Sequence, residues 1–443
     1  MRVLVYGLGK SGLAALQLAV KQGHTVTGFD ARDPSEWRDE ITPMGASSTL
    51  RPTTVDCDVC IASPGVPIDH PDLRALQAQG TEVIGEIAWV SRTVPGPKLA
   101  VTGTAGKGTV SRWAFDCLQQ AGMDAVLGGN IDPPLAAVAK KDVWAVTEVS
   151  SFQLERSPGY DAEVAVITNL GRDHLDRHGT LETYHATKRR LIEQQSAGHR
   201  AILNADDPVA STWAALRPDD TWTFGLGPMA DVRLDAGQVW IADQPLMDAR
   251  ELPHEAPHLV ANTLAAIAAA TAAGAPATAI REAATAFEAT PGRFETVAER
   301  CGVTFIDDSI ATRDVAVAAA LRGANGPVAW ILGGQDKGAD PAALAADADH
   351  VRLAIGIGAA GEAYVGALPE ACDTHVVRAE RGVDAMDAAV RMAAEAARSW
   401  GGGTVLLAPL GASFDQFGSY TERGAAFRGA VRRLLEEPTW TDC

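Results

Sequence analysis

The sequence predicts an α/β protein built from three domains, each containing a mostly parallel, doubly wound sheet. Short apolar strands alternate with helical patterns along most of the chain, which is typical of parallel sheets covered by helices on both faces. At 443 residues the chain is also too long for one ordinary core, and the usual domain size suggests about three domains. Two glycine-rich loops, each between a strand and a helix, mark separate sites for anionic ligands.

The composition is that of an acidic globular protein. Hydrophobic residues make up 47% of the chain, charged residues make up 21%, and the formal charge is -18. So acidic a chain has no general attraction for a polyphosphate backbone, which excludes nucleic acid as the default partner. A phosphorylated ligand must instead be held by local groups such as backbone amides, helix N-termini and a few placed cations.

No pattern in the sequence directs the chain to a membrane. The start, Met1 to Gly7, runs directly into a strand and a turn without a signal-peptide layout. No apolar run is long enough to cross a bilayer. The six cysteines in so long a chain do not form a disulfide framework. We therefore expect a cytoplasmic protein with no membrane contact.

The first domain, residues 1–92, contains a glycine loop that predicts a nucleotide ligand. Gly7-Leu-Gly-Lys-Ser-Gly12 lies between a strand and a helix, and Asp30 closes the next strand. This is the dinucleotide-binding fingerprint of a Rossmann-like domain. The alternative is a glycine turn that only allows the strand and the helix to pack closely. The predicted strands of this domain are Arg2–Tyr6, His24–Phe29, Asp58–Ala62 and Thr81–Ile84.

The second domain, residues 93–290, carries the strongest motif of the chain. Gly103-Thr-Ala-Gly-Lys-Gly-Thr109 follows a strand and precedes a helix, so its main-chain amides can converge on an anion at the helix N-terminus. Lys107 supplies a cation for the β- and γ-phosphates. Because Gly108 stands where a hydroxyl usually holds Mg²⁺, Thr109 is the remaining candidate for that ligand. The motif predicts a P-loop ATPase-like domain that binds ATP.

Two further polar motifs follow buried strands of this domain. Glu148-Val-Ser-Ser-Phe-Gln153 begins where one strand ends, and Thr168–His178 places His174 between two aspartates directly after another strand. Open α/β sheets bind ligands at this edge, where an acid beside a phosphate loop suits Mg²⁺. The first motif alone is equally compatible with a helix N-cap. Lys188 shares a helix face with Tyr184, and sequence alone does not separate it from an ordinary surface lysine.

The third domain, residues 291–443, begins after the turn sequence Ala289-Thr-Pro-Gly-Arg293. A helical pattern covers Gly382–Ser399, and the predicted strands are Thr304–Asp307, Val328–Leu332, Leu353–Ile357 and Thr404–Ala408. This alternation predicts a second Rossmann-like unit at the C-terminal end of the chain. The three units share no repeat period, so the pattern does not indicate a solenoid.

Taken in order, these motifs resemble the Mur ligase family over essentially the whole chain. The similarity also includes Gly292–Glu295, Asp308–Thr312, Leu332–Gly338 and Ser413–Phe417. The resemblance implies a monomeric, three-domain ligase of peptidoglycan precursor synthesis. It implies that ATP phosphorylates the terminal carboxylate of UDP-N-acetylmuramoyl-L-alanine. The amine of D-glutamate then attacks the acyl phosphate, which gives an amide, ADP and phosphate.

The resemblance also implies which residues hold ATP and Mg²⁺. The catalytic residues carried over are Lys107, Glu148, His174 and Lys188. The ATP contacts are Gly103, Thr104, Ala105, Gly106, Lys107, Gly108, Thr109, Asn262, Arg293 and Asp308. The metal ligands are Thr109, Glu148, His174 and Lys188, the last as a carbamylated lysine. Reaction with CO₂ converts a cation into a carboxylate, and it is favoured by a neutral amine with a lowered pKa.

The substrates are assigned by the same resemblance. The fingerprint of the first domain then binds a uridine nucleotide instead of NAD. The contacts to the UDP-linked substrate are Ser11, Asp30, Arg32, Ser63, Gly65, Asn130, Ser150 and Gln153. The contacts to D-glutamate are Thr312, Lys337, Ser413 and Phe414, with the lysine paired to a carboxylate.

The chain departs from the family's pattern at four positions and leaves three other functions open. The departures are Gly108, Arg172, Leu259 and Ile310, and Arg313 restores one positive charge beside the last. One alternative is a related amide ligase that adds a different amino acid. Another is a catalytically weak nucleotide-binding relative. The third, an NAD-linked oxidoreductase built on the first glycine loop, leaves the phosphate loop of the second domain unexplained.

Overall fold

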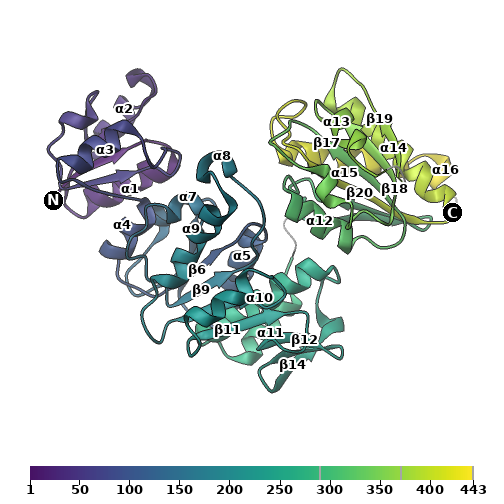
Figure 1. The fold of residues 1–443 in the computed structure, drawn as a ribbon, viewed down its shortest axis with the longest axis horizontal. Helices are drawn as coiled ribbons and strands as arrows, with labels where there is room; N and C mark the ends of the chain where they lie inside the picture. Colours follow the sequence, from purple (N-terminus) through teal and green to yellow (C-terminus); the bar gives the residue numbers. More distant parts are fainter. Residues whose placement is uncertain (289–290, 370–371, 442–443) are drawn as a thin grey trace. The chain divides into compact units, whose positions relative to one another are not determined.

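The computed structural model describes residues 1–288, 291–369 and 372–441 as two compact bodies (Figure 1). The first body comprises residues 1–253 and 261–287, and the second comprises 254–260 and 288–443. Both are α/β, as predicted. The expected domain boundary at residue 92 stays a prediction, and the boundary at 290 falls on residues 289–290, which lie outside the described residues. No described helix is long and apolar enough to cross a membrane.

The first body begins with a five-stranded parallel sheet in the order β3-β2-β1-β4-β5. Its strands are β1 (Arg2–Tyr6), β2 (Thr25–Phe29), β3 (Ser47–Ser48), β4 (Val59–Ala62) and β5 (Glu82–Ile84). The helices around it are α1 (Lys10–Lys21), α2 (Arg38–Ile41) and α3 (Pro71–Ala78). Val3 and Val5 pack in the apolar cluster that contains α1, while Leu4 and Tyr6 pack in a second cluster with α3. Because the order of strands reverses at β1 and β4, ligands are expected at their carboxyl ends.

A nine-stranded sheet follows, in the order β14-β13-β12-β11-β10-β9-β6-β8-β7. The strands that position the site are β6 (Lys98–Thr102), β7 (Ala125–Gly129), β8 (Trp144–Glu148) and β9 (Val164–Ile167). The others are β10 (Arg200–Asn204), β11 (Thr221–Gly225), β12 (Val232–Asp235), β13 (Gln238–Ile241) and β14 (Gln244–Asp248). Adjacent strands from β7 to β12 are parallel, so β6 to β9 all end at one edge of the sheet.

Helices cover both faces of this sheet. Helix α5 contacts β6, β7 and β8, while α9 contacts β6 and packs Leu191 and Ile192 in the apolar cluster that contains Ala100 and Ala165 of the sheet. The helices of this part are α5 (Lys107–Gln120), α6 (Leu135–Val138), α7 (Ser151–Leu154), α8 (Leu175–His178), α9 (Leu181–Glu193), α10 (Pro257–Ala272) and α11 (Ala277–Thr285). The helix predicted after the motif Gly103–Thr109 and the helix predicted to carry Tyr184 and Lys188 are therefore confirmed as α5 and α9.

The antiparallel strands β12, β13 and β14 were not predicted from the sequence. Two-residue turns join them, and both Ala236 and Ala242 adopt positive φ. Sequence reading recognises such turns by Asn-Gly or Asp-Gly pairs, because those residues tolerate positive φ well. Here the turns are Ala236-Gly237 and Ala242-Asp243, so the usual signal is weak.

Helix α4 (Glu86–Thr93) connects the two sheets of the first body. Its residues lie in one apolar cluster with residues of both sheets, including Val3 and Ala145. The amide of Gly85 donates to the Arg156 carbonyl at 2.6 Å, and the buried Glu86 carboxylate accepts from the Ala136 amide at 2.6 Å. The segment from Gly85 to Thr93 that joins the two sheets is therefore packed, and it is hydrogen-bonded to the part of the chain that forms the second sheet.

The second body contains a six-stranded sheet in the order β15-β16-β20-β17-β18-β19. Its strands are β15 (Glu295–Arg300), β16 (Val303–Asp307), β17 (Val328–Gly333), β18 (Val351–Ile357), β19 (Asp373–Val376) and β20 (Gly403–Leu410), and only β15 is antiparallel to its neighbour. The helices are α12 (Asp314–Gly323), α13 (Gly361–Gly366), α14 (Gly382–Ser399), α15 (Tyr420–Leu435) and α16 (Pro438–Thr441). Helices α14 and α15 form the apolar cluster over one face. The predicted α/β architecture is confirmed here too.

Gly12 tests the packing of the first glycine loop. A Cβ at this position would lie 1.9 Å from the Gly7 carbonyl oxygen, whereas a Cβ at Gly9 would meet nothing within 4 Å. We expect Gly12→Ala to lower the free energy of unfolding by more than about 1 kcal/mol, because the loop has to move. The matched variant Gly9→Ala should change it by less than about 0.5 kcal/mol. Urea unfolding of both variants measures this, and equal losses would contradict the packing described.

Candidate functional site

The predicted phosphate loop, Gly103 to Thr109, follows β6. It is held by residues that come directly after the neighbouring strand β9. The amides of Thr104 and Ala105 donate to the carbonyl and side-chain oxygens of Asn169, both at 2.9 Å. The hydroxyl of Thr168 donates to the Ala105 carbonyl at 2.6 Å. Lys107 begins α5 and donates to the Thr104 carbonyl at 2.9 Å. These bonds fix the loop in place before any ligand binds.

Two glycines of this loop could not be replaced without moving it. Gly103 and Gly106 have φ of 151° and 79°. A Cβ at Gly103 would lie 1.9 Å from Thr168 Oγ1, and one at Gly106 would lie 2.5 Å from Asn262 Oδ1. The structure thus brings Asn262, one of the predicted ATP contacts, against the phosphate loop. Thr109 is buried in the first turn of α5.

Glu148 lies at the carboxyl end of β8, next to the phosphate strand β6. It is 5% exposed, and its carboxylate accepts a hydrogen bond of 2.7 Å from Asn130 Nδ2. The Asn130 amide also donates to the Glu148 carbonyl at 2.8 Å. Asn130 follows β7, so adjacent strand ends bring these two predicted site residues together.

His174 lies in the loop that follows β9, on the other side of β6. Its Nε2 is 3.4 Å from a carboxylate oxygen of Asp173, and its backbone has a positive φ of 50°. The imidazole ring packs against Phe152 with 4.7 Å between the ring centroids. Since Phe152 belongs to the motif that begins at Glu148, the two predicted metal ligands are attached to one packed cluster.

Lys188 is a buried residue of α9 and not a surface lysine. It is 1% exposed, and its Nζ donates to the Gly103 carbonyl at 2.7 Å and lies 4.8 Å from the centre of the Tyr184 ring. Burial lowers the pKa of Lys188 well below its ordinary value of 10.5, and the Lys107 ammonium lowers it further. Asp173 and Glu148 act in the opposite direction. The amine therefore belongs to the same electrostatic cluster as the phosphate loop.

Ser150 and Gln153 satisfy each other in the structure. Ser150 caps α7, with the Gln153 amide donating to its hydroxyl and the Gln153 side chain accepting from the Ser150 amide at 3.0 Å. This is a capping box, which is the structural alternative that the motif left open. Their contact with the UDP-linked substrate stays a prediction.

The residues at this edge could hold a divalent cation only by combining different kinds of donor, namely a carboxylate, an imidazole and a hydroxyl. In the described parts of the chain, no three His, Cys, Asp or Glu side chains form a metal-holding group. Glu148 and His174 supply two donors of these types, and the hydroxyl of Thr109 is a third oxygen donor of the kind that Mg²⁺ accepts. Lys188 would supply a carboxylate only if its amine were modified. The buried, pKa-lowered amine is compatible with that modification.

Part of the residue set predicted for the UDP-linked substrate lies at the first glycine loop, whereas Asn130, Ser150 and Gln153 of that set lie after β7 and β8 of the second sheet. The Leu8 amide donates to Asp30 at 2.6 Å, and Arg32 pairs with Asp30 and donates to the Leu8 carbonyl at 3.0 Å. A Cβ at Gly7 would lie 2.8 Å from Ser63 Cβ, so the segment after β4 packs against this loop. Ser11 lies in the first turn of α1, and Gly65 is exposed.

The predicted residues of the second body form two groups. Asp308 is buried, and this burial raises its pKa to about 7, while the Arg293 guanidinium acts in the opposite direction. Lys337 Nζ lies 5.8 Å from the centre of the Phe414 ring, which is 66% exposed. The other two D-glutamate residues are Thr312, in the turn after β16, and Ser413, which is buried after β20. The structure thus brings Lys337 and Phe414 together.

Sequence reasoning missed the residues that support the phosphate loop. In the sequence, Thr168 and Asn169 are visible only as the start of a polar motif, yet they make most of the contacts that hold Ala105. Their position directly after a buried strand was the available signal, since strand ends at this edge converge. Tyr184, whose hydroxyl lies 3.2 Å from Thr104 Oγ1, is a second supporting residue.

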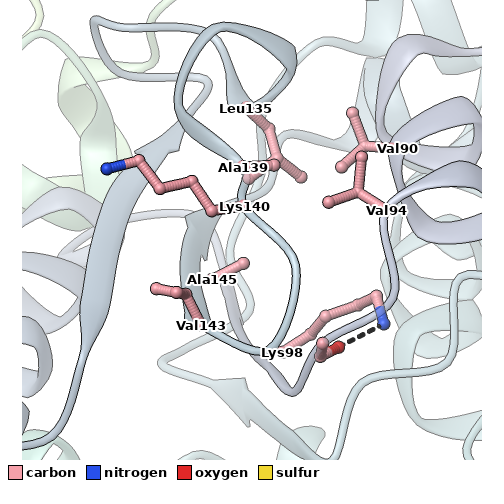
Figure 2. Close-up of a pocket in the computed structure, with 9 residues that line it drawn as sticks. Val90, Val94, Lys98, Leu135, Ala139, Lys140, Val143 and Ala145 are labelled. Carbon is pink, nitrogen blue, oxygen red and sulfur yellow. Dashed lines mark hydrogen bonds between the residues drawn. The ribbon is translucent and has the colours of Figure 1, made fainter. Parts of the chain in front are cut away.

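A small cavity lies among residues in or next to α4, α6, β6 and β8 (Figure 2). Its volume of about 10 Å³ admits about one water molecule. It is lined by residues including Val90, Val94, Leu135 and Lys98, whose Nζ donates to the Gly96 carbonyl at 2.9 Å. Lys98 begins β6, whereas the phosphate loop follows the end of that strand. The cavity is thus separate from the candidate site.

Comparison with known families agrees with this geometry along the chain. Residues 1–85 match the family model "Mur ligase MurD-like, N-terminal domain", 101–270 match "Mur ligase middle domain", and 292–411 match "Mur ligase, glutamate ligase domain". The chain belongs to the Mur ligase family. The middle-domain match contains the phosphate loop, Glu148, His174 and Lys188, so the residues gathered at the sheet edge lie in the part typical of Mur ligases.

Individual relatives of this Mur ligase are similar over nearly its full length. It is 44% identical to a UDP-N-acetylmuramoylalanine--D-glutamate ligase of Deinococcus radiodurans, over 98% of this chain and 92% of the relative. It is 40% identical to the enzyme of the same name from Thermus thermophilus, over 99% of each chain. A pseudomurein peptide ligase type C from Methanothermus fervidus has the same fold, with a TM-score of 0.64, 18% identity, and 98% and 99% of the two chains covered.

A titration of stability tests the burial of Lys188. Because its pKa in the folded protein lies below that of the unfolded chain, the unfolded state binds more protons between the two values, and stability rises with pH in that range. We expect the free energy of unfolding of the unmodified protein to rise relative to Lys188→Met as pH increases towards 10.5. Denaturant unfolding in CO₂-free buffer measures this. The exposed control Lys141→Met should run parallel to the unmodified protein, and a parallel Lys188→Met profile would contradict the burial.

Proposed function

We propose that this Mur ligase joins D-glutamate to UDP-N-acetylmuramoyl-L-alanine at the expense of ATP, in peptidoglycan precursor synthesis. The observation that carries the proposal is the arrangement around β6, where Glu148, Lys188 and His174 surround one phosphate loop. The names of its similar relatives in Deinococcus and Thermus support the same reaction. We infer that the chain works as a cytoplasmic monomer with no nucleic-acid partner.

In this proposal the phosphate loop holds ATP. The amides of Gly103 to Thr109 and the dipole of α5 face the phosphates, and Lys107 moves from the Thr104 carbonyl to an anionic oxygen. Phosphorylation gives the substrate carboxylate a leaving group, which a free carboxylate lacks. The amine of D-glutamate then displaces phosphate from the acyl phosphate to form the amide. Each anionic reactant needs neutralising groups, because two anions must approach each other.

The Mg²⁺ ligands of this proposal are Thr109, Glu148, His174 and Lys188. The ion would neutralise charge shared by the phosphate and the carboxylate. Asn130 orients the Glu148 carboxylate through its 2.7 Å hydrogen bond. Asp173 and Phe152 position the His174 ring from two sides. These supporting residues fix the donors in advance, which limits reorganisation during the reaction.

We further propose that Lys188 is carbamylated. The neutral amine adds to CO₂, releases one proton and becomes an N-linked carboxylate. Burial and the Lys107 ammonium both favour the neutral amine, as they lower its pKa. The negative product suits its surroundings, since Lys107 lies close to it and a cation is expected beside Glu148. The modification thereby gives Lys107 an anionic neighbour, whereas a protonated Lys188 would repel it.

The remaining assignments follow the family resemblance. Asn262, Arg293 and Asp308 complete the ATP contacts. Lys337, Thr312, Ser413 and Phe414 receive D-glutamate, and Lys337 supplies the charge for a carboxylate. The segment from Ser63 and the pair Asp30–Arg32 receive the nucleotide end of the other substrate, together with Ser11, Gly65, Asn130, Ser150 and Gln153.

An amino-acid survey tests the reaction. With UDP-N-acetylmuramoyl-L-alanine, ATP and Mg²⁺, D-glutamate should release phosphate at least about tenfold faster than L-glutamate, L-lysine or meso-diaminopimelate. Mass spectrometry of the product should show the added glutamyl residue. Release with another amino acid alone would indicate a different amide ligase. Nucleotide binding without turnover of any amino acid would indicate a non-catalytic relative.

A rescue experiment tests the modified lysine. Lys188→Ala should lower turnover by more than about 100-fold, since the variant lacks a ligand that supports the cation. Bicarbonate with a short carboxylic acid should restore part of that activity. The exposed control Lys141→Ala should keep full activity with and without the acid. Unchanged turnover in Lys188→Ala would overturn the role.

A further inference from the structure

The loop after β4 is held by an arginine in the turn that follows α7. Arg156 is 5% exposed and donates from Nη1 to the Val66 carbonyl at 2.8 Å and from Nη2 to the Pro67 carbonyl at 2.6 Å. A longer contact of 3.5 Å reaches the Ser63 carbonyl. One guanidinium thus spans the segment Ser63–Pro67, in which Ser63 packs against the first glycine loop.

A second arginine reaches the same segment from α8. Arg177 Nη2 donates to the Val66 carbonyl at 2.8 Å and lies 3.4 Å from the Pro64 carbonyl. The same guanidinium makes a double contact with the carboxylate of Glu155, at 3.1 Å and 2.6 Å. The Val66 carbonyl therefore accepts hydrogen bonds from two arginines at equal distances.

This arrangement has an electrostatic cost, because burial and a neighbouring like charge both disfavour a charged guanidinium. Two guanidinium groups lie close together in a mostly buried place, and the pKa of Arg156 is lowered first by burial and then by Arg177. Glu155 pairs with Arg177 and also acts on Arg156, where it raises the pKa, so its carboxylate is shared between the two guanidinium groups. A single arginine would hold the loop with less repulsion. The second one makes the position of the segment depend on α8 as well as on α7.

Both arginines are attached to the residues that surround the phosphate loop. Arg156 follows α7, whose capping box lies directly after Glu148. Arg177 lies in α8, three residues after His174, and its guanidinium carbon is 4.9 Å from the centre of the Phe152 ring, which also contacts His174. His178 joins the two helices through a 3.0 Å contact with Ser151. A displacement of Glu148 or His174 would therefore also displace Arg156 and Arg177, the arginines that donate hydrogen bonds to the Ser63–Pro67 segment.

We propose that Arg156 and Arg177 are positioning residues that hold the Ser63–Pro67 segment in register with Glu148 and His174. Through this clamp, the loop that receives the nucleotide-linked substrate is kept at a fixed place relative to the phosphate site. The inference rests on the proposed function for the identity of that substrate. The two arginines then influence the binding of this substrate, through the position of the loop, and not the binding of ATP.

The test compares Arg156 with an arginine of the same kind elsewhere in the domain. Like Arg156, Arg217 donates to three carbonyls, those of Gln195, Ser196 and His199. It also pairs with Asp220, as Arg177 pairs with Glu155. Arg156→Ala should lower kcat/KM for UDP-N-acetylmuramoyl-L-alanine about tenfold or more, while KM for ATP changes by less than about twofold. Arg217→Ala should lower thermal stability to a similar degree and leave both parameters unchanged.

Charge-conserving variants keep the test decisive if the alanine variants do not fold. Arg156→Lys and Arg177→Lys retain one positive charge but cannot span two carbonyls, so we expect an intermediate loss confined to the nucleotide-linked substrate. Equal kinetic losses for UDP-N-acetylmuramoyl-L-alanine and for ATP in Arg156→Ala, or an equal fall of kcat/KM for UDP-N-acetylmuramoyl-L-alanine in Arg217→Ala, would overturn the inference. Calorimetry with UDP-N-acetylmuramoyl-L-alanine and no ATP separates the two proposals. Weaker binding of UDP-N-acetylmuramoyl-L-alanine to Arg156→Ala supports the clamp even if the amino acid that the enzyme adds is not D-glutamate.

Discussion

The site of this Mur ligase depends on one constraint of parallel sheets, namely that adjacent strands end at the same edge. The phosphate strand β6 lies between β8 and β9, and β7 lies beyond β8. Glu148, the loop before His174 and Asn130 are therefore neighbours, although they are far apart in the sequence. Antiparallel pairing at any of these strands would send one of the groups to the opposite edge. The antiparallel strands of the sheet occur only past β12, away from these residues.

The electrostatics of this sheet edge depend on Lys188, whose amine contacts the phosphate loop. The Lys188 amine is buried on the Gly103 carbonyl, where water cannot screen its interaction with Lys107. A permanently charged lysine would be repelled there, so the surroundings favour a neutral or modified amine. The loop itself is held through Thr168 and Asn169. Charge and backbone support thus come from different neighbouring elements.

The parallel strands and the sheet edge that carries the site could be predicted from the sequence. Apolar strands that end in polar residues are visible as patterns, so the edge carrying Glu148 and His174 was predictable. The turns at Ala236 and Ala242 were not, because they lack the residues that usually mark positive φ. Arg156 was also not predictable. Its partners are backbone carbonyls some 90 residues earlier, and carbonyls leave no trace in side-chain patterns.

The central claim is that the groups around β6 transfer phosphate to a carboxylate rather than to water or a hydroxyl. Transfer of labelled oxygen tests this most directly. With ¹⁸O in the alanine carboxylate of UDP-N-acetylmuramoyl-L-alanine, an acyl phosphate passes one carboxylate oxygen to the released phosphate in each turnover. Mass spectrometry of that phosphate should show one ¹⁸O atom per molecule formed. Amide product with unlabelled phosphate would contradict the account.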